Sequence, residues 1–201
     1  TEDASIKDNN SVVAGTTDDI EPSVVADDGT IYGFRRDTKE FVKSTDPLDG
    51  FETVSTPSNL AVVRNHMQLH MTGNGTFLVG TNSSIYRSTD GGQTWTAVQS
   101  LATSGSCRSF SENTNGDIIA AEYFNDASLW QSSDDGASWT RIATPSDLPE
   151  ITDHIHRARY APSDPNRIVL TYGDNLANSG YYRSDDNGST WEHLDPTAPT
   201  N

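Results

Sequence analysis

Short stretches in which apolar and polar residues alternate recur along the chain, and turn-forming residues separate them. In residues 64–71, Met67, Leu69 and Met71 fall on one side of an extended chain, while Arg64, His66, Gln68 and His70 fall on the other. Such alternation predicts a half-buried β-strand. We expect similar strands at 23–26, 30–34, 41–44, 51–54, 76–81, 85–88, 95–98, 107–111, 117–123, 129–132, 139–143, 154–160, 167–172, 181–184 and 191–194.

A nine-residue motif lies between the third and fourth strand of each expected group. Residues 87–95, 131–139 and 183–191 all contain the pattern S-x-D-x-G-x-[ST]-W, and residues 43–51 form a degenerate copy with Phe51 in place of Trp. The motif aspartates, at positions 46, 90, 134 and 186, recur at intervals of 44, 44 and 52 residues. This period indicates a repeated supersecondary unit that buries its faces against its neighbours.

Four strands in each repeat, joined by hairpins, are typical of a β-propeller blade. The sequence therefore predicts an all-β propeller with four blades of four antiparallel strands in residues 20–195. The blades are expected at about 20–56, 60–100, 105–145 and 150–195. Two alternatives stay open, a closed four-bladed propeller and part of a larger one. Residues 1–19 are expected to form a polar extension in which 11–15 could add a strand, and 196–201 a polar tail.

The motif residues have structural roles in this prediction. The aspartate can accept hydrogen bonds from backbone N–H groups of its own turn, and glycine supplies a conformation that a side chain disfavours. The tryptophan is expected to anchor the turn by burying its ring between sheets. The residues so assigned are Ser88, Asp90, Gly92, Trp95, Ser132, Asp134, Gly136, Trp139, Ser184, Asp186, Gly188 and Trp191.

These residues resemble the Asp-box, or BNR, repeats of sialidases, sortilin-type receptors, xyloglucanases and many bacterial and viral propellers. The resemblance covers about residues 20–195. It implies the propeller fold, with the boxes at the blade rims and any ligand site near the central axis. Because Asp boxes occur in enzymes and in non-enzymes, the resemblance does not imply an activity.

The chain is strongly acidic and poor in apolar residues. Asp and Glu number 29 against 13 Lys and Arg, which gives a net charge of −16, and the apolar fraction is 33%. This composition indicates a halophile's protein, the alternative being an ordinary acidic secreted protein. It argues against nucleic acid as a partner, since no basic footprint exists. With a single cysteine, Cys107, no intramolecular disulfide can form.

Potential cations gather on the strands expected to line the axis. Four of the five histidines and four of the ten arginines fall there, although the chain as a whole is acidic. They could form a funnel for an anionic ligand such as a sialic or uronic acid. The alternative is that they face a water-filled channel and bond only to their neighbours. The candidate ligand-binding residues are Arg64, His66, His70, Arg108, His154, His156 and Arg157.

Two enzyme classes compete with a binding role, and no catalytic residue is assigned. A sialidase would need an arginine triad, for which Arg64, Arg108 and one of Arg157 or Arg159 are candidates. It would also need a tyrosine–glutamate pair, for which Tyr160 and Glu122 are candidates; the Arg-Ile-Pro signature of sialidases is absent. A polysaccharide lyase would use histidine, tyrosine and arginine, for which His66, His156, Tyr160 and Arg108 are candidates.

No metal site and no cofactor is predicted. His154 and His156 could share a face with His66 or His70, but such pairs on strands are more often not ligands. Residues 185–188 do not satisfy the calcium-loop pattern, and their place in the motif explains them.

The first functional hypothesis is therefore a non-catalytic binding or adhesion module of a halophile's cell envelope or virus particle, such as a tail fibre. Its expected partners are a glycan or surface receptor and other subunits of an assembly. The alternatives are a carbohydrate-active enzyme and an architectural spacer. No apolar run approaches the roughly 18 residues of a membrane span. Because the sequence begins at Thr1 and not at Met, we expect a chain that is processed, excised or tagged off, with any signal peptide missing from view. The expected location is extracellular, on a cell or on a virion.

Overall fold

The computed structural model of the chain describes residues 19–60, 68–102, 106–123, 128–144, 146–148, 154–173 and 179–194. All regular elements in these residues are β-strands, and they form four antiparallel sheets of four strands each. The strands are β1 (Ile20–Val25), β2 (Ile31–Arg35), β3 (Phe41–Ser44), β4 (Glu52–Ser55), β5 (Gln68–Met71), β6 (Phe77–Gly80), β7 (Ser84–Ser88), β8 (Thr96–Ser100), β9 (Ser106–Glu112), β10 (Ile118–Tyr123), β11 (Leu129–Ser132), β12 (Thr140–Ala143), β13 (Ile155–Ala161), β14 (Asp164–Tyr172), β15 (Gly180–Ser184) and β16 (Glu192–Leu194).

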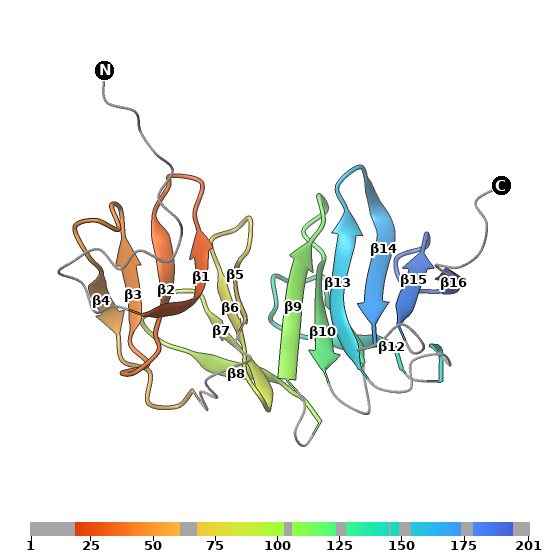
Figure 1. Cartoon of the computed structure of the whole chain (residues 1–201), viewed down its shortest axis with the longest axis horizontal. Helices are drawn as coiled ribbons and strands as arrows, with labels where there is room; N and C mark the ends of the chain where they lie inside the picture. The colour runs from red at the N-terminus through yellow and green to blue at the C-terminus, as the bar shows by residue number, and fades with distance from the viewer. Residues whose placement is uncertain are drawn as a thin grey trace.

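Each sheet pairs its strands in sequence order, as a propeller blade does. The first strands of successive sheets lie side by side, with β1 against β5, β5 against β9 and β9 against β13. The sheets run from β4 at one end of the molecule to β16 at the other (Figure 1). Among the described strands, β1 and β13 do not pack closely on each other. The prediction of four four-stranded units is confirmed, while the choice between a closed and a larger propeller stays open.

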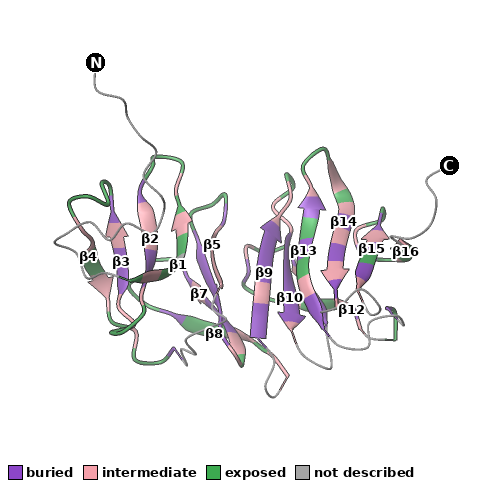
Figure 2. Cartoon of the chain, in the orientation of Figure 1, coloured by how far each residue is buried: buried purple, intermediate pink, exposed green. Residues whose placement is uncertain are grey.

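The core is divided among the junctions between successive sheets. Phe34 and Phe41 pack with Phe77 and Trp95 at the first junction, and corresponding clusters fill the next two. Burial is most complete in β6, β9 and β10, as Figure 2 shows for β9 and β10, whereas no residue of β5 is buried. All four residues of β6 are buried because a sheet packs on each of its faces. The sheets therefore depend on one another for their stability.

The motif turns are held by a repeated set of hydrogen bonds. The Ser88 hydroxyl donates to Asp90 Oδ1 over 2.8 Å, and its oxygen accepts from the Gly92 amide over 3.0 Å. Asp90 also accepts from the backbone N–H and the hydroxyl of Thr94. These bonds, those from Thr94 above all, lower the pKa of Asp90 to about 2. The turns around Asp134 and Asp186 repeat the pattern, with the pKa of each carboxyl also about 2.

The degenerate first motif has fewer of these bonds. In the described structure the Asp46 carboxylate accepts a hydrogen bond from the Leu48 amide over 2.9 Å, and no bond to a hydroxyl is present. The first motif has Gly50 where the other three have Thr94, Ser138 or Thr190, so it lacks the hydroxyl group that bonds the aspartate in those turns. The expected strand at 11–15 and the polar ends lie outside the described residues.

Candidate functional site

The site is built on β9 and β13, which lie side by side and run in the same direction (Figure 1). Two serines of β9 bond to the backbone of β13. Ser109 Oγ accepts from the Ala158 amide and Ser111 Oγ accepts from the Tyr160 amide, each over 3.0 Å. These buried bonds fix the register between two neighbouring sheets, so the remaining side chains of both strands have defined positions.

A β-bulge interrupts each of these strands near its start. On β9, Cys107 and Ser109 pair with consecutive residues of β10, which leaves Arg108 as the extra residue. On β13, Ile155 and Arg157 pair with consecutive residues of β14, which leaves His156 as the extra residue. Because a bulge breaks the alternation of side chains, it turns these two residues away from the faces that a regular strand would give them.

Tyr123 joins Arg108 to the two histidines of the fourth sheet. The Arg108 guanidinium carbon lies 3.8 Å from the centre of the Tyr123 ring. That ring lies 3.9 Å from the His154 ring and 6.0 Å from the His156 ring, between centroids. His154 Nε2 and His156 Nε2 are 3.2 Å apart, within hydrogen-bond distance. We call Arg108, Tyr123, His154 and His156 the inner cluster.

The arginines of the inner cluster and of β13 differ from those elsewhere. Arg157 and Arg159 are exposed, and neither has a hydrogen bond or ion pair in the part of the chain that the structure describes. Arg108 Nε is buried without an acceptor among the described residues. By contrast, most other arginines form ion pairs with carboxylates, namely Arg35, Arg36, Arg87, Arg167 and Arg183. Arg141 stacks on the Trp130 ring.

His70 lies apart from the other histidines, near the far end of β9. Its Nε2 is 3.3 Å from a Glu112 carboxylate oxygen, and its ring stacks on Phe110. Burial lowers the pKa of His70, and Arg159 adds to this, while Glu112 opposes it. Glu112 and Arg159 also line a cavity of about 450 Å³ between the ends of β9 and β13. Glu112 and one of the unpaired arginines therefore line the same cavity.

The family model for Sortilin-Vps10, described as sortilin or neurotensin receptor 3, matches residues 83–200, more than half of the chain. The chain belongs to the Sortilin-Vps10 family. The predicted resemblance to Asp-box propellers is thereby confirmed. No match was found among curated proteins.

Solved structures similar to this Sortilin-Vps10 chain include β-propellers with different roles. A GH74 xyloglucanase from Xanthomonas campestris is 19% identical, with a TM-score of 0.66, over 89% of this chain and 30% of that one. YCF48 bound to D1 peptide is 14% identical, with a TM-score of 0.60, over 91% and 55%. A PL25 ulvan lyase is 13% identical, with a TM-score of 0.57, over 86% and 54%. The chain thus spans only part of each relative, and the similarity is one of fold.

Tyr160 and Glu122, the pair considered for a sialidase, belong to two separate hydrogen-bond networks in this Sortilin-Vps10 chain. The Tyr160 hydroxyl accepts from Gln131 Nε2 over 2.7 Å and donates to Asn187 Oδ1 over 3.1 Å. Burial raises the pKa of Tyr160 to about 12, which disfavours a phenolate nucleophile. Glu122 is 1% exposed and accepts from Trp130 Nε1 over 2.9 Å. Each side chain therefore bonds within a packed junction between strands.

Four further observations bear on the predictions from the sequence. Arg64 and His66 lie outside the described residues. No group of three or more His, Cys, Asp or Glu within the described ranges could hold a metal ion. Cys107 is buried, and this burial raises the pKa of its thiol. No helix in the described ranges is long and apolar enough to span a membrane. The inner cluster thus gathers Arg108, His154 and His156 of the predicted residues, with Arg157 next along the strand.

Tyr123 and Glu112 were not singled out as ligand-binding residues in the sequence. Tyr123 ends β10, and its register opposite Ser106 carries it to Arg108. Glu112 ends β9 and bonds to His70 and to the Gly73 amide of the preceding sheet. Neither interaction joins residues close in sequence. Their neighbours in the sequence, Glu122 and Phe124 for Tyr123 and Ser111 and Asn113 for Glu112, give no signal of these contacts.

Proposed function

We propose that the chain is a non-catalytic binding module that holds an acidic glycan, containing a uronic or sialic acid, against β9 and β13. The observation that carries the proposal is the set of guanidinium groups left without carboxylate partners. In a chain with a net charge of −16, acids are abundant, yet Arg108, Arg157 and Arg159 have none bound in the described structure.

Arginine suits this role because its planar fork can bind both oxygens of a carboxylate. Arg157 and Arg159 are two residues apart on β13, and both are exposed, so their side chains share one face of the strand. Arg108 lies beside the start of that strand, stacked on Tyr123. Arg108, Arg157 and Arg159 thus form a row, and a ligand with acid groups on successive sugars could bind to all three. Such a ligand would also give the buried Arg108 Nε–H group the acceptor that it lacks among the described residues.

We propose a non-catalytic role because the carboxylates nearest to the three arginines are already bonded to other groups. Glu112 is occupied by His70 and by the Gly73 amide, and Glu122 is buried against Trp130. A glycosidase of the usual kind needs two carboxyl groups facing one bond of the substrate. As a binding module, the chain is expected to act outside the cell or on a surface, with a glycan-bearing receptor and neighbouring subunits as partners.

A polysaccharide lyase is the second candidate, and the inner cluster is the observation that favours it. A lyase acting on a uronate needs a base, an acid and a cation that neutralises the carboxylate. His156, Tyr123 and Arg108 supply these three groups within one packed cluster. A similar structure is that of an ulvan lyase bound to -[GlcA(1-4)Rha3S]-. Release of an unsaturated uronate, followed by its ultraviolet absorbance, would identify this activity.

The first test is calorimetric titration of the protein with hexagalacturonate. We expect the acidic hexasaccharide to bind, and the double variant Arg157→Ala/Arg159→Ala to weaken that binding by at least about tenfold, since each lost charge-assisted contact contributes about 1.5–3 kcal/mol. The matched control is Arg167→Ala/Arg183→Ala. It removes the same charge from arginines that are paired on the outer strands.

The control is expected to bind within about twofold of the unmodified protein, with a similar decrease of affinity as salt rises. Equal weakening by both double variants would mean that net charge alone governs binding. Full binding by Arg157→Ala/Arg159→Ala would remove these arginines from the site and contradict the proposal.

A further inference from the structure

The residue after each motif aspartate occupies the same backbone position in three of the turns. Gly91, Asp135 and Asn187 all have positive φ, of 71°, 58° and 57°. Each turn lies over the preceding sheet, as the close approach of Gly92 to Phe41 and of Gly136 to Leu78 indicates. A side chain at this position is therefore directed toward the preceding sheet. The three turns differ in what they place there.

At the second junction the position holds a carboxylate. Asp135 Oδ1 accepts from the Thr72 hydroxyl over 2.7 Å, and Oδ2 accepts from Arg87 over 3.0 Å and from the Thr76 hydroxyl. Arg87 Nε also donates to the Asp135 carbonyl over 2.8 Å. At the third junction Asn187 Oδ1 accepts from Gln131 Nε2 over 2.8 Å and from the Tyr160 hydroxyl over 3.1 Å. Both side chains thus connect two sheets.

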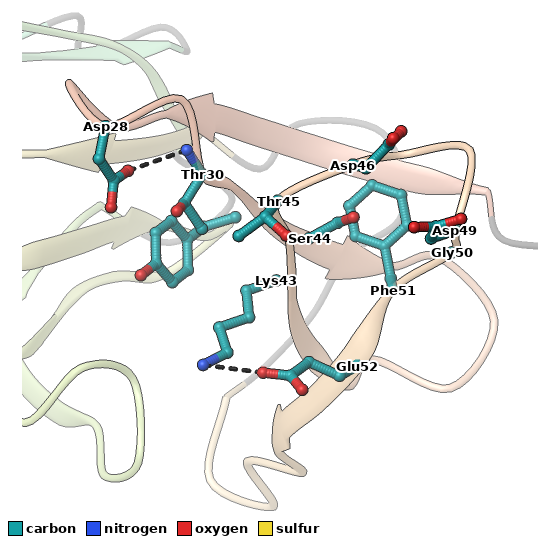
Figure 3. Close-up of a pocket in the computed structure, with 11 residues that line it drawn as sticks. Asp28, Thr30, Lys43, Ser44, Thr45, Asp46, Asp49, Gly50, Phe51 and Glu52 are labelled. Atoms are coloured by element: carbon teal, nitrogen blue, oxygen red, sulfur yellow. Dashed lines mark hydrogen bonds and ion pairs between the residues drawn. The ribbon is translucent and has the colours of Figure 1, made fainter.

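At the first junction the position holds Gly91, and no such connection exists. A Cβ built on Gly91 would have no atom within 4 Å. The repeat aligns Thr30 with Thr76, since each follows the glycine of the turn between the first and second strands of its sheet, and Lys43 with Arg87, since each precedes the motif serine. Thr30 and Lys43 line a cavity of about 540 Å³ (Figure 3). Ala26 stands where the second sheet has Thr72, so the first sheet keeps two of these receiving groups, on Thr30 and Lys43, but lacks the side chain that they would receive.

The lining of this cavity excludes an anionic ligand. Four carboxylates, from Asp28, Asp46, Asp49 and Glu52, line the cavity with one ammonium group, and Lys43 Nζ already lies 2.8 Å from Glu52 Oε1. The same groups are well suited to hydroxyl groups, because each carboxylate can accept several hydrogen bonds and Lys43 can donate three. Tyr32 and Phe51 add aromatic surface to the lining. Aromatic rings with a few polar groups are typical of a small-ligand site.

We propose that this cavity binds a neutral sugar residue, with hydroxyl groups of the sugar near the position that Asp135 fills at the second junction. This site is separate from the arginines of β13, and the inference does not rest on the proposed function. It assigns a neutral glycan to the first sheet and leaves the acidic ligand to the third and fourth. A glycan with both kinds of sugar could engage both sites, which would raise its overall affinity.

The test is to fill the position with Gly91→Asp. Aspartate tolerates positive φ, as Asp135 does, and its carboxylate would reach toward Thr30 and Lys43. We expect the protein to bind cellohexaose or mannohexaose, measured by saturation-transfer NMR, and Gly91→Asp to reduce that binding by at least about tenfold. The matched control is Gly116→Asp, which adds the same charge at positive φ with no atom within 4 Å, in another sheet.

A second variant covers the case in which Gly91→Asp disturbs the turn. Lys43→Met keeps the length of a side chain that is 44% exposed, and is expected to weaken neutral-sugar binding without lowering the thermal midpoint. Arg157→Ala/Arg159→Ala is expected to leave this binding unchanged, which separates the two sites. Failure of the unmodified protein to bind either neutral hexasaccharide, or full binding by both Gly91→Asp and Lys43→Met, would overturn the inference.

Discussion

Trp95→Ala is expected to lower the free energy of unfolding by about 3–5 kcal/mol, the largest effect of any single motif residue. The Trp95 ring is 5% exposed and packs against the rings of Phe41 and Phe34, at centroid distances of 5.3 and 5.7 Å. Its Nε1 donates to the Gly92 carbonyl over 3.1 Å. Removing the ring would leave a void between the first two sheets and an acceptor without its donor.

Trp191→Ala provides the matched control for this prediction. Trp191 occupies the same motif position, but its ring is only partly buried, and its Nε1 is buried without a partner among the described residues. We expect a smaller loss, of about 1–2 kcal/mol, measured by urea unfolding followed by tryptophan fluorescence and circular dichroism. Equal losses in the two variants would show that the junction around Trp95 contributes no more than the last motif turn.

Gly136→Ala is expected to lower the free energy of unfolding by about 2–4 kcal/mol, from two causes that add. The φ of Gly136 is 79°, which strains any residue with a Cβ. The added Cβ would also lie 2.6 Å from Leu78 Cδ2, a buried atom of the preceding sheet. The turn must therefore move away from the sheet on which it packs.

Gly91→Ala separates the two causes. Its φ is 71°, but the new Cβ would have no atom within 4 Å. We expect a loss of about 1 kcal/mol from backbone strain alone, measured by the same urea unfolding. If Gly91→Ala were as destabilising as Gly136→Ala, contact with the preceding sheet would not be the reason for glycine at position 136.

The sequence was sufficient to predict the four sheets because the motif turns carry local information. The hydrogen bonds between Ser88, Asp90 and Thr94 join residues only two to four positions apart, so the pattern that specifies the turn can be read directly. Strand positions then follow from alternation on either side of each turn. How the sheets close, or what adjoins them, depends on contacts between distant residues, which the pattern of a single repeat does not contain.

The candidate site was predicted only in part, for a physical reason that can be named. We placed Arg108, His154 and His156 on regularly alternating strands, whereas bulges at Arg108 and His156 change their direction. A bulge is a property of the pairing between two strands, so one strand's sequence does not reveal it. The stacking of Arg108 on Tyr123 is a consequence of that pairing.

The clustering of cations on the inner strands was visible in the sequence, but their ionic partners were not. Arg87 and Arg157 are both strand arginines followed by small residues, yet Arg87 reaches Asp135 of the next sheet while Arg157 has no carboxylate in the described structure. Which arginines remain unpaired is decided by packing between sheets. That distinction, and not the number of cations, is the basis of the proposed function.

The most direct test of that function observes the Arg108 Nε–H group while hexagalacturonate is added. Arginine side-chain ¹H–¹⁵N spectra resolve such groups, and the spectrum of Arg108→Lys would assign the signal by its absence. We predict that the Arg108 signal shifts to higher proton frequency and exchanges more slowly as the buried donor gains an acceptor, while the signals of Arg167 and Arg183 stay unchanged. Binding of the ligand with no change at Arg108, or with equal changes at all three arginines, would contradict the account.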